Sequence, residues 1–115
     1  MLRKLYVKQS LRNAGGGIEF DLKNGLGSGY AYKMQPVELD GIQAPLESTT
    51  FTLEGGAEVK FSDVSKENTF TLAMNKTLTI RVAGHTLTPG PHKIGMGFDV
   101  PGLGTLRFDF TDTVK

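Results

Sequence analysis

Residues 94–100 read Ile-Gly-Met-Gly-Phe-Asp-Val, residues 101–105 read Pro-Gly-Leu-Gly-Thr, and residues 106–110 read Leu-Arg-Phe-Asp-Phe. In the first and third segments, large apolar side chains occupy every second position, which is the period of a β-strand. These side chains share one face of a hairpin, and the opposite face carries Lys93, Asp99, Arg107 and Asp109. A lone hairpin is marginally stable in water, so burial of the apolar face requires a second layer.

The same period recurs along the chain, in residues 18–23, 49–53, 57–61, 69–74 and 76–82. Asp40-Gly41, between residues 37–39 and 42–44, predicts a type I′ turn that sets Leu39 opposite Ile42. Residues 5–8 read as a further short strand. Whether residues 69–74 and 76–82 form two strands or one kinked strand is left open by the pattern. We expect one all-β domain over residues 1–115, a two-layer antiparallel β-sandwich of eight or nine short strands with several hairpins; a flattened barrel is the alternative.

The alternation also predicts the core and two registers. In the final hairpin we expect Val100 opposite Leu106 and Asp99 opposite Arg107, which would place opposite charges across the strands. Phe51 should pair with Val59. The predicted core is Leu5, Val7, Ile18, Phe20, Leu22, Leu39, Phe51, Leu53, Val59, Leu72, Leu78, Ile80, Val82, Ile94, Met96, Phe98, Val100, Leu106, Phe108 and Phe110.

Gly95 and Gly97 leave bare backbone on the other face of their strand. Glycines at such positions predict either close approach of another surface or a strong twist.

Composition excludes several classes of protein. The 115 residues carry 13 basic and 12 acidic side chains, for a net charge of +1, and contain no cysteine. Neither sign of charge forms a long run, so a nucleic-acid groove or a polybasic membrane face is not expected. The lack of cysteine excludes disulfides and thiolate metal sites. With no apolar segment long enough for a signal or a membrane span, we expect a cytoplasmic protein.

Candidate catalytic residues are few. The two histidines, His85 and His92, could form a metal site with Asp99, Asp109 or Asp112, but no short ligand spacing supports it. We therefore favour a role for both histidines as ordinary turn residues. The serines lie in no nucleophile motif. We assign no catalytic residue, no metal ligand and no cofactor to this chain.

Tyr30 and Tyr32 lie two residues apart, on one face of an expected strand beside a glycine-rich loop. Such a pair is compatible with plain packing, with a protein interface or with a sugar-binding platform. Together with His85 and His92, these tyrosines are the candidate residues for contact with a substrate or a partner.

The order of motifs resembles one family. The motifs are Leu11-Arg-Asn13, Ile18-Glu-Phe20, Val37-Glu-Leu-Asp-Gly41, Phe51-Thr-Leu-Glu-Gly55, Leu87-Thr-Pro-Gly-Pro-His92 and Gly97-Phe-Asp-Val-Pro101. Together they look like the small β subunit of the C-glycoside deglycosidases and a related domain of unknown function. The resemblance implies a β-sandwich bound to a TIM-barrel α subunit of the sugar-phosphate isomerase/epimerase type. That α subunit would hold a divalent metal, commonly manganese, and would cleave the carbon–carbon bond between a 3-oxo sugar and an aromatic aglycone.

Three hypotheses follow. The first is an accessory subunit of such a metal-dependent lyase, with the main catalytic groups on the partner chain. The second is a stand-alone carbohydrate-binding or homo-oligomeric interaction module that uses Tyr30 and Tyr32. The third is an independent metalloenzyme centred on His85 and His92.

Overall fold

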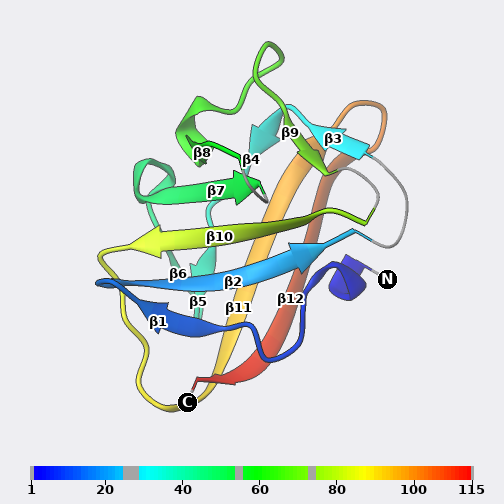
Figure 1. Cartoon of the computed structure of the whole chain (residues 1–115). Coiled ribbons are helices and arrows are strands. Elements are labelled where there is room, and N and C mark those ends of the chain that lie inside the picture. The colour runs from blue at the N-terminus through cyan, green and yellow to red at the C-terminus, as the bar shows by residue number, and fades with distance from the viewer. Residues whose placement is uncertain (1, 25–28, 54–55, 73–74, 115) are drawn as a thin grey trace.

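A computed structural model describes residues 2–24, 29–53, 56–72 and 75–114 of the chain (Figure 1). These residues form twelve β-strands and three short 3-10 helices, which confirms the predicted all-β class. The number of strands exceeds eight or nine because several strands are only two or three residues long. In the described ranges, no helix has the length and apolar character that crossing a membrane requires.

The first sheet contains five antiparallel strands in the order β1-β2-β10-β7-β8. Its strands are β1 (Arg12–Ala14), β2 (Gly17–Lys23), β10 (Thr77–Ala83), β7 (Thr49–Leu53) and β8 (Glu58–Lys60). Ile80 of β10 lies opposite Phe20 on one side and Phe51 on the other. Alternation therefore places three large apolar side chains side by side on the inner face.

The second sheet is built on the two longest strands and has the order β12-β11-β5-β6. Its strands are β12 (Gly104–Val114), β11 (Gly90–Val100), β5 (Glu38–Leu39), β6 (Ile42–Gln43) and β4 (Lys33–Met34), which also pairs with β11. Strands β3 (Gly29–Ala31) and β9 (Phe70–Leu72) form a separate pair. The 3-10 helices are η1 (Leu2–Leu5), η2 (Leu46–Ser48) and η3 (Phe61–Asp63).

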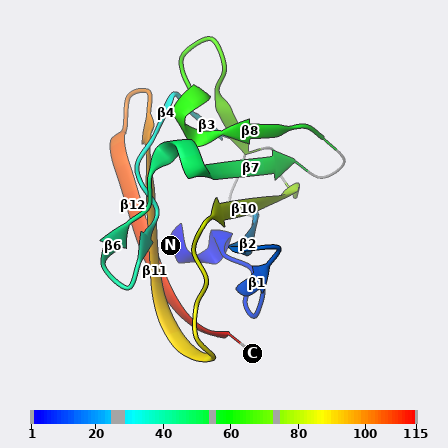
Figure 2. The ribbon, with the colours of Figure 1, turned by 90° about the vertical axis from the view of Figure 1, so that its left-hand side faces the viewer.

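The two large sheets form the predicted two layers. In Figure 1 the strands of the first sheet run across the view, and β11 and β12 cross behind them at a steep angle. Figure 2 shows the layers side by side, with β11 and β12 on one side and the first sheet on the other. Such crossed packing buries one face of each sheet in a shared interior.

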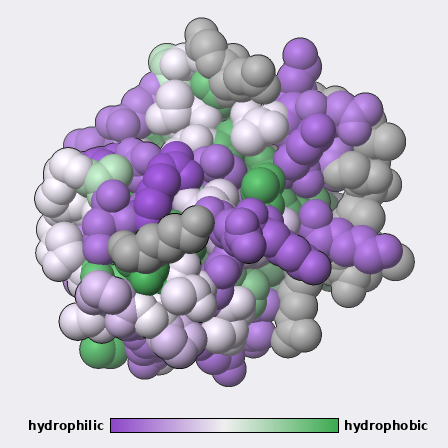
Figure 3. Space-filling model, turned by 60° about the horizontal axis from the view of Figure 1, so that its bottom comes forward, coloured by the Kyte–Doolittle hydropathy of each residue, from purple (hydrophilic) through white to green (hydrophobic). Residues whose placement is uncertain are grey.

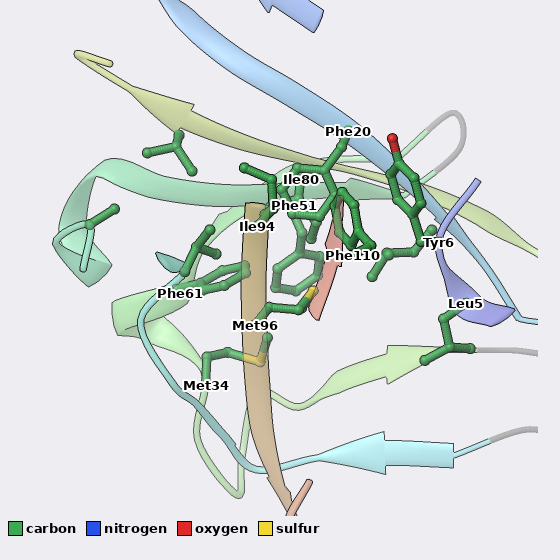
Figure 4. Packing of buried hydrophobic residues seen from close by; sticks show 14 of the residues in the cluster. Leu5, Tyr6, Phe20, Met34, Phe51, Phe61, Ile80, Ile94, Met96 and Phe110 are labelled. Atoms are coloured by element: carbon green, nitrogen blue, oxygen red, sulfur yellow. The ribbon is translucent and has the colours of Figure 1, made fainter. Parts of the chain in front are cut away.

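Aromatic rings fill this interior (Figure 4). Tyr6 stacks on Phe110 with ring centroids 3.6 Å apart, and Phe20 meets Phe110 edge to face at 5.4 Å. A second group joins Phe51 and Phe70, whose centroids lie 4.9 Å apart. Offset and edge-to-face contacts of this kind stabilise a core beyond the area that they bury.

Most of the predicted core is buried, with some corrections. The assignment of Leu53 to the core is wrong, because its side chain lies at the end of β7 and is 40% exposed. Val7, Val59, Val100 and Leu106 are only partly buried, and the side chain of Leu72 lies outside what the structure describes. The pattern also missed Val114 at the end of the long strand β12. The other buried residues that it missed lie in short or irregular segments: Tyr6, Leu11, Ala31, Met34, Val37, Ala44, Phe61 and Phe70.

Two predicted hairpins are confirmed. Asp40 and Gly41 both have positive φ, 52° and 87°, as a type I′ turn requires, and Leu39 pairs with Ile42. The register of β7 on β8 sets Phe51 opposite Val59.

The predicted register of the final hairpin is wrong by two residues. Val100 pairs with Gly104 and Asp99 pairs with Thr105, so Arg107 lies opposite Gly97. The reason is a tighter turn, in which the Leu103 N–H donates to the Val100 carbonyl at 3.1 Å. Gly102 and Gly104 both adopt a φ of 79°, which residues with a side chain rarely adopt.

The structure corrects the prediction for residues 5–8 and decides between the two alternatives left open for residues 69–82. Residues 5–8 do not form a strand, since the chain begins with η1 and Tyr6 makes only an isolated bridge to Leu22. Residues 69–83 contain two strands, β9 and β10, and Asn75 between them has a φ of 62°. β9 pairs with β3, whereas β10 enters the first sheet.

The chain itself covers the bare backbone at Gly95 and Gly97. Arg107 Nη2 donates to Glu38 Oε2 at 2.7 Å. A Cβ at Gly97 would lie 2.7 Å from Arg107 Cγ, whereas a Cβ at Gly95 would lie 3.7 Å from Glu38 Cβ. The surface that approaches Gly97 is therefore an intramolecular side chain.

These distances predict opposite outcomes for two similar substitutions. Gly97→Ala should destabilise the fold by about 1–3 kcal/mol, because the new methyl group displaces Arg107. Gly95→Ala should leave stability unchanged or raise it by up to about 1 kcal/mol, because alanine loses less backbone entropy on folding. Urea unfolding of both variants measures the difference. In an Arg107→Ala background, the loss at residue 97 should become smaller but should not vanish, because the new Cβ would still lie 3.0 Å from the Leu106 carbonyl oxygen; an undiminished loss would show that Arg107 is not its cause.

Candidate functional site

Tyr30 and Tyr32 lie beside the turn of the long hairpin. β3 contacts β11, and the Tyr32 N–H donates to the Asp99 carbonyl at 3.0 Å. The Gln35 N–H donates to the Gly97 carbonyl at 2.9 Å, so the chain runs along β11 after β3. In Figure 1 the turn between β11 and β12, in orange, lies next to β3.

A surface hollow of about 390 Å³ joins the two tyrosines to this turn. Tyr30, Tyr32, Lys66 and Pro101 line it. Tyr30 is 50% exposed, and Leu103, two residues after Pro101, is 69% exposed. We call these five residues the hairpin-tip site. The structure thus brings together the two tyrosines predicted from sequence, and adds three residues that no spacing in the sequence connects to them.

Lys66 divides the surface around Tyr32. Its Nζ lies 5.9 Å from the centroid of the Tyr32 ring, within the range of a cation–π interaction. A second hollow, of about 440 Å³, also includes Tyr32 and Lys66 and extends to Met34, Leu46 and other residues. One face of the Tyr32 ring is therefore already occupied by a cation of the same chain.

His92 has a structural position on β11. Its Nδ1 lies 2.6 Å from Asp40 Oδ2, and its Nε2 lies 2.7 Å from the Thr88 carbonyl oxygen. Both of these partners are acceptors, so only the protonated ring, with two N–H groups, satisfies both. Asp40 also accepts a hydrogen bond from the Lys93 N–H at 2.9 Å. This cluster fastens the β5–β6 turn to β11.

The pKa values of the pair follow from these bonds. The hydrogen bond to Asp40 and then that to the Thr88 carbonyl raise the pKa of His92 above its ordinary value. The hydrogen bonds from His92 and from the Lys93 N–H lower the pKa of Asp40. The charged pair is therefore favoured in the folded chain.

His85 is not brought to this cluster. It is half-buried in the connection between β10 and β11. Among the described residues, no group of three or more His, Asp or Glu side chains is placed to hold a metal ion. The arrangement of His85 and His92 with an aspartate, weighed above as a metal site, does not occur in that part of the chain.

Sequence reasoning missed a polar cluster around Tyr6 and Asp112. The Tyr6 hydroxyl donates to Asp112 Oδ2 at 2.6 Å and accepts from the Leu11 N–H at 3.1 Å. The Gln9 N–H donates to the same carboxylate oxygen at 2.7 Å. Burial and then the contact with Asp112 raise the pKa of Tyr6 to about 12. Burial alone would raise the pKa of Asp112, but the hydrogen bonds from Tyr6 and the neighbouring N–H groups lower it.

The His92–Asp40 pair predicts a stability that depends on pH. A raised histidine pKa contributes stability below about pH 6.5 that is lost as pH rises through the folded-state pKa. The lowered pKa of Asp40 contributes stability above about pH 3.8 that is lost in acid. The free energy of unfolding should therefore fall as pH rises above about 6.5 and through the raised folded-state pKa of His92. Asp40→Asn keeps a residue suited to positive φ and should flatten this dependence; an unchanged slope in urea unfolding would contradict the assignment.

A second prediction concerns the buried phenol. Tyr6→Phe removes the hydroxyl that serves both Asp112 and the Leu11 N–H, and should destabilise the fold by about 1–3 kcal/mol. Tyr30→Phe is the matched control, because its ring is half exposed, and should change stability by less than about 0.5 kcal/mol. Thermal unfolding of both variants compares them. Equal stability of the two would show that the Tyr6 hydroxyl contributes nothing.

Comparison with known proteins corrects the resemblance drawn from the sequence. The protein-family model described as hydroxymethylglutaryl-CoA reductase, N-terminal domain, matches residues 1–115. A search of curated proteins finds no match. Among solved structures, the chain is similar to ACE19, the collagen binding subdomain of the Enterococcus faecalis surface protein ACE. The identity is 14%, the TM-score is 0.37, and 96% of each chain is covered.

The predicted membership of the C-glycoside deglycosidase β subunits is therefore wrong. Glycine turns and alternating strands recur in any antiparallel sandwich, so their order does not identify one family. The TIM-barrel partner, its manganese and the lyase reaction find no support in the match. The chain belongs to the family of hydroxymethylglutaryl-CoA reductase N-terminal domains.

Proposed function

We propose that this chain is an accessory module that binds a larger catalytic protein through the hairpin-tip site. One observation carries the proposal: half-exposed Tyr30 and exposed Leu103 lie at the same end of the sandwich, with a hollow between the tyrosines and Pro101. Tyrosines are enriched at protein interfaces because they present a large rigid ring with a polar end. Another face, seen from below in Figure 3, mixes hydrophilic side chains with small separate hydrophobic patches.

The family match indicates the kind of partner. The description of the family names the N-terminal domain of a reductase. Such a domain lies beside the other domains of the same enzyme. We therefore assign the role of partner to the catalytic region of a hydroxymethylglutaryl-CoA reductase. On this proposal the chain supplies contact surface and the partner supplies the chemistry.

The polar clusters of the sandwich are consistent with a chain that supplies contact surface and leaves the chemistry to its partner. His92 and Asp40 fasten a turn, and Glu38 and Arg107 cover bare backbone. Asp99 accepts a hydrogen bond from the Thr105 hydroxyl at 2.6 Å across the final hairpin. Each of these charged groups has a structural partner within the fold, so it is less available to act on a substrate.

Binding of a sugar is the second candidate, because both tyrosines line one hollow with Pro101. A sugar platform uses the open face of an aromatic ring. Lys66 lies over one face of the Tyr32 ring, so a sugar could stack on that face only if Lys66 moved. The docking proposal needs no such movement, and we therefore prefer it.

The test measures, by calorimetry, the affinity of the purified chain for the reductase catalytic region of the same organism. Leu103→Ser and Tyr30→Ala should each weaken binding by about tenfold or more, a loss of about 1.4 kcal/mol, because exposed apolar and aromatic anchors carry much of the energy of an interface. Ile42→Ser is the matched control, since Ile42 is also 69% exposed but lies in β6, away from the turn between β11 and β12. It should bind like the parent chain.

Two outcomes would contradict docking at this site. In the first, the catalytic region does not bind at all. In the second, Ile42→Ser weakens binding as much as Leu103→Ser does. Titration with simple glycosides separates the second candidate, because a carbohydrate module would bind them alone and Tyr30→Ala would abolish that binding.

A further inference from the structure

Strand β12 is an unusual sheet edge. Among the described strands, the other edges of the two large sheets are β1, β8, β6 and β4, which are two or three residues long. β12 is an edge strand of eleven residues, and its sequence contains no proline. Proteins protect exposed edges by keeping them short or by placing proline in them, because an open edge pairs readily with another strand. The chain follows this rule at these four edges and departs from it at β12, which is long, although η1 contacts this strand.

The centre of β12 carries opposite charges on either side of one aromatic residue. Arg107 and Asp109 flank Phe108. Phe108 faces the core and is 8% exposed, whereas the Arg107 and Asp109 side chains are each 42% exposed. Side chains at alternate positions point to opposite faces, so the two charges share the outer face of the sheet.

We propose that two copies of this chain pair through β12, antiparallel, with Phe108 opposite Phe108 of the second copy. In this register Arg107 lies opposite Asp109 of the second copy, and the twofold axis repeats the same pair. Leu106 then faces Phe110 of the second copy on the inner side. The ladder joins the two second sheets into one continuous sheet.

The neighbouring registers are all worse. A shift by two residues in one direction sets Asp109 opposite Asp109, and in the other direction it sets Arg107 opposite Arg107. Like charges directly opposite each other destabilise a strand pair. A shift by one residue turns the apolar row of the second copy to the wrong face. The sequence of β12 therefore favours a single self-complementary register.

The contacts within one copy leave room for this pairing. Arg107 gives one N–H to Glu38, and a guanidinium has five such donors. The Lys93 ammonium lies 3.9 Å from the Asp109 carboxylate. A carboxylate has about four acceptor positions, so Asp109 can keep its contacts within one copy and accept a further hydrogen bond from the second. At the end of the ladder, the segment that binds Asp112 through Tyr6 and Gln9 would meet Gly104 of the second copy, which has no side chain to obstruct it.

Sedimentation equilibrium of the full chain tests the proposal. The parent chain should reach twice its mass of 12.5 kDa in the micromolar range. Arg107→Asp and Asp109→Arg each create two like-charge pairs in the dimer, and each should weaken it by at least about tenfold. Far-ultraviolet circular dichroism of each variant checks that it is folded.

Variants that restore opposite charges between the two copies give the decisive result. The double variant R107D/D109R restores opposite charges between copies, although it sets residue 107 against Glu38 and residue 109 against Lys93 within each copy. It should dimerise again. Mixing the two single variants also brings opposite charges together at both positions, and should produce a heterodimer from two monomers. Leu103→Ser, at the hairpin-tip site, should dimerise normally, which separates this interface from the proposed docking surface.

The proposal is overturned if the parent chain stays monomeric throughout, or if neither the double variant nor the mixture regains the dimer. It is also overturned if a different protein, and not a second copy, pairs with β12. Hydrogen exchange provides a measurement that needs no variant: the amides of residues 104–112 should gain protection as the concentration of the parent chain rises.

Discussion

Strand β11 is the element on which the rest of the structure depends. Its inner face supplies Ile94, Met96 and Phe98 to the core, and all three are buried. Its two edges pair with β12 on one side and with β4 and β5 on the other. The segments that carry the candidate site residues are positioned by hydrogen bonds to β11, from the Tyr32 and Gln35 N–H groups and from Asp40. Burial of one face of this strand thus sets the position of most of the second sheet.

The outer face of β11 explains an apparent weakness of the strand. Glycine within a strand reduces stability, and the interior of β11 has two glycines, Gly95 and Gly97. At Gly97 the missing side chain makes room for Arg107, which reaches across the strand to Glu38. An ion pair on an exposed surface contributes little by itself. Its main effect here is to cover the backbone and to connect β12 with β5 across β11.

The sequence predicted those features that depend on local periodicity. Alternation identified the buried faces of β2, β10 and β11, and Asp40-Gly41 identified a turn, because both signals lie within a few residues. The register of β11 on β12 was missed because Gly102 and Gly104 tighten the turn, and their φ angles cannot be read from residue type alone. The contact of Tyr6 with Asp112 was missed because 106 residues separate them. The hairpin-tip site was half predicted: two tyrosines at close spacing suggested a surface, whereas Lys66 and Leu103 reach it only through the fold.

The long hairpin is consistent with the binding role that we propose for this molecule. β11 and β12 supply one face of the core. Their turn carries exposed Leu103 of the hairpin-tip site, and β12 is an edge strand of the second sheet. The titratable groups on these strands are held by neighbours within the fold, as His92 is by Asp40 and Asp112 is by Tyr6. Groups fixed in this way stabilise the hairpin and keep its turn and edge in a constant position. A rigid element that presents both an apolar tip and a long sheet edge is suited to recognition, because little conformational entropy is lost when it binds.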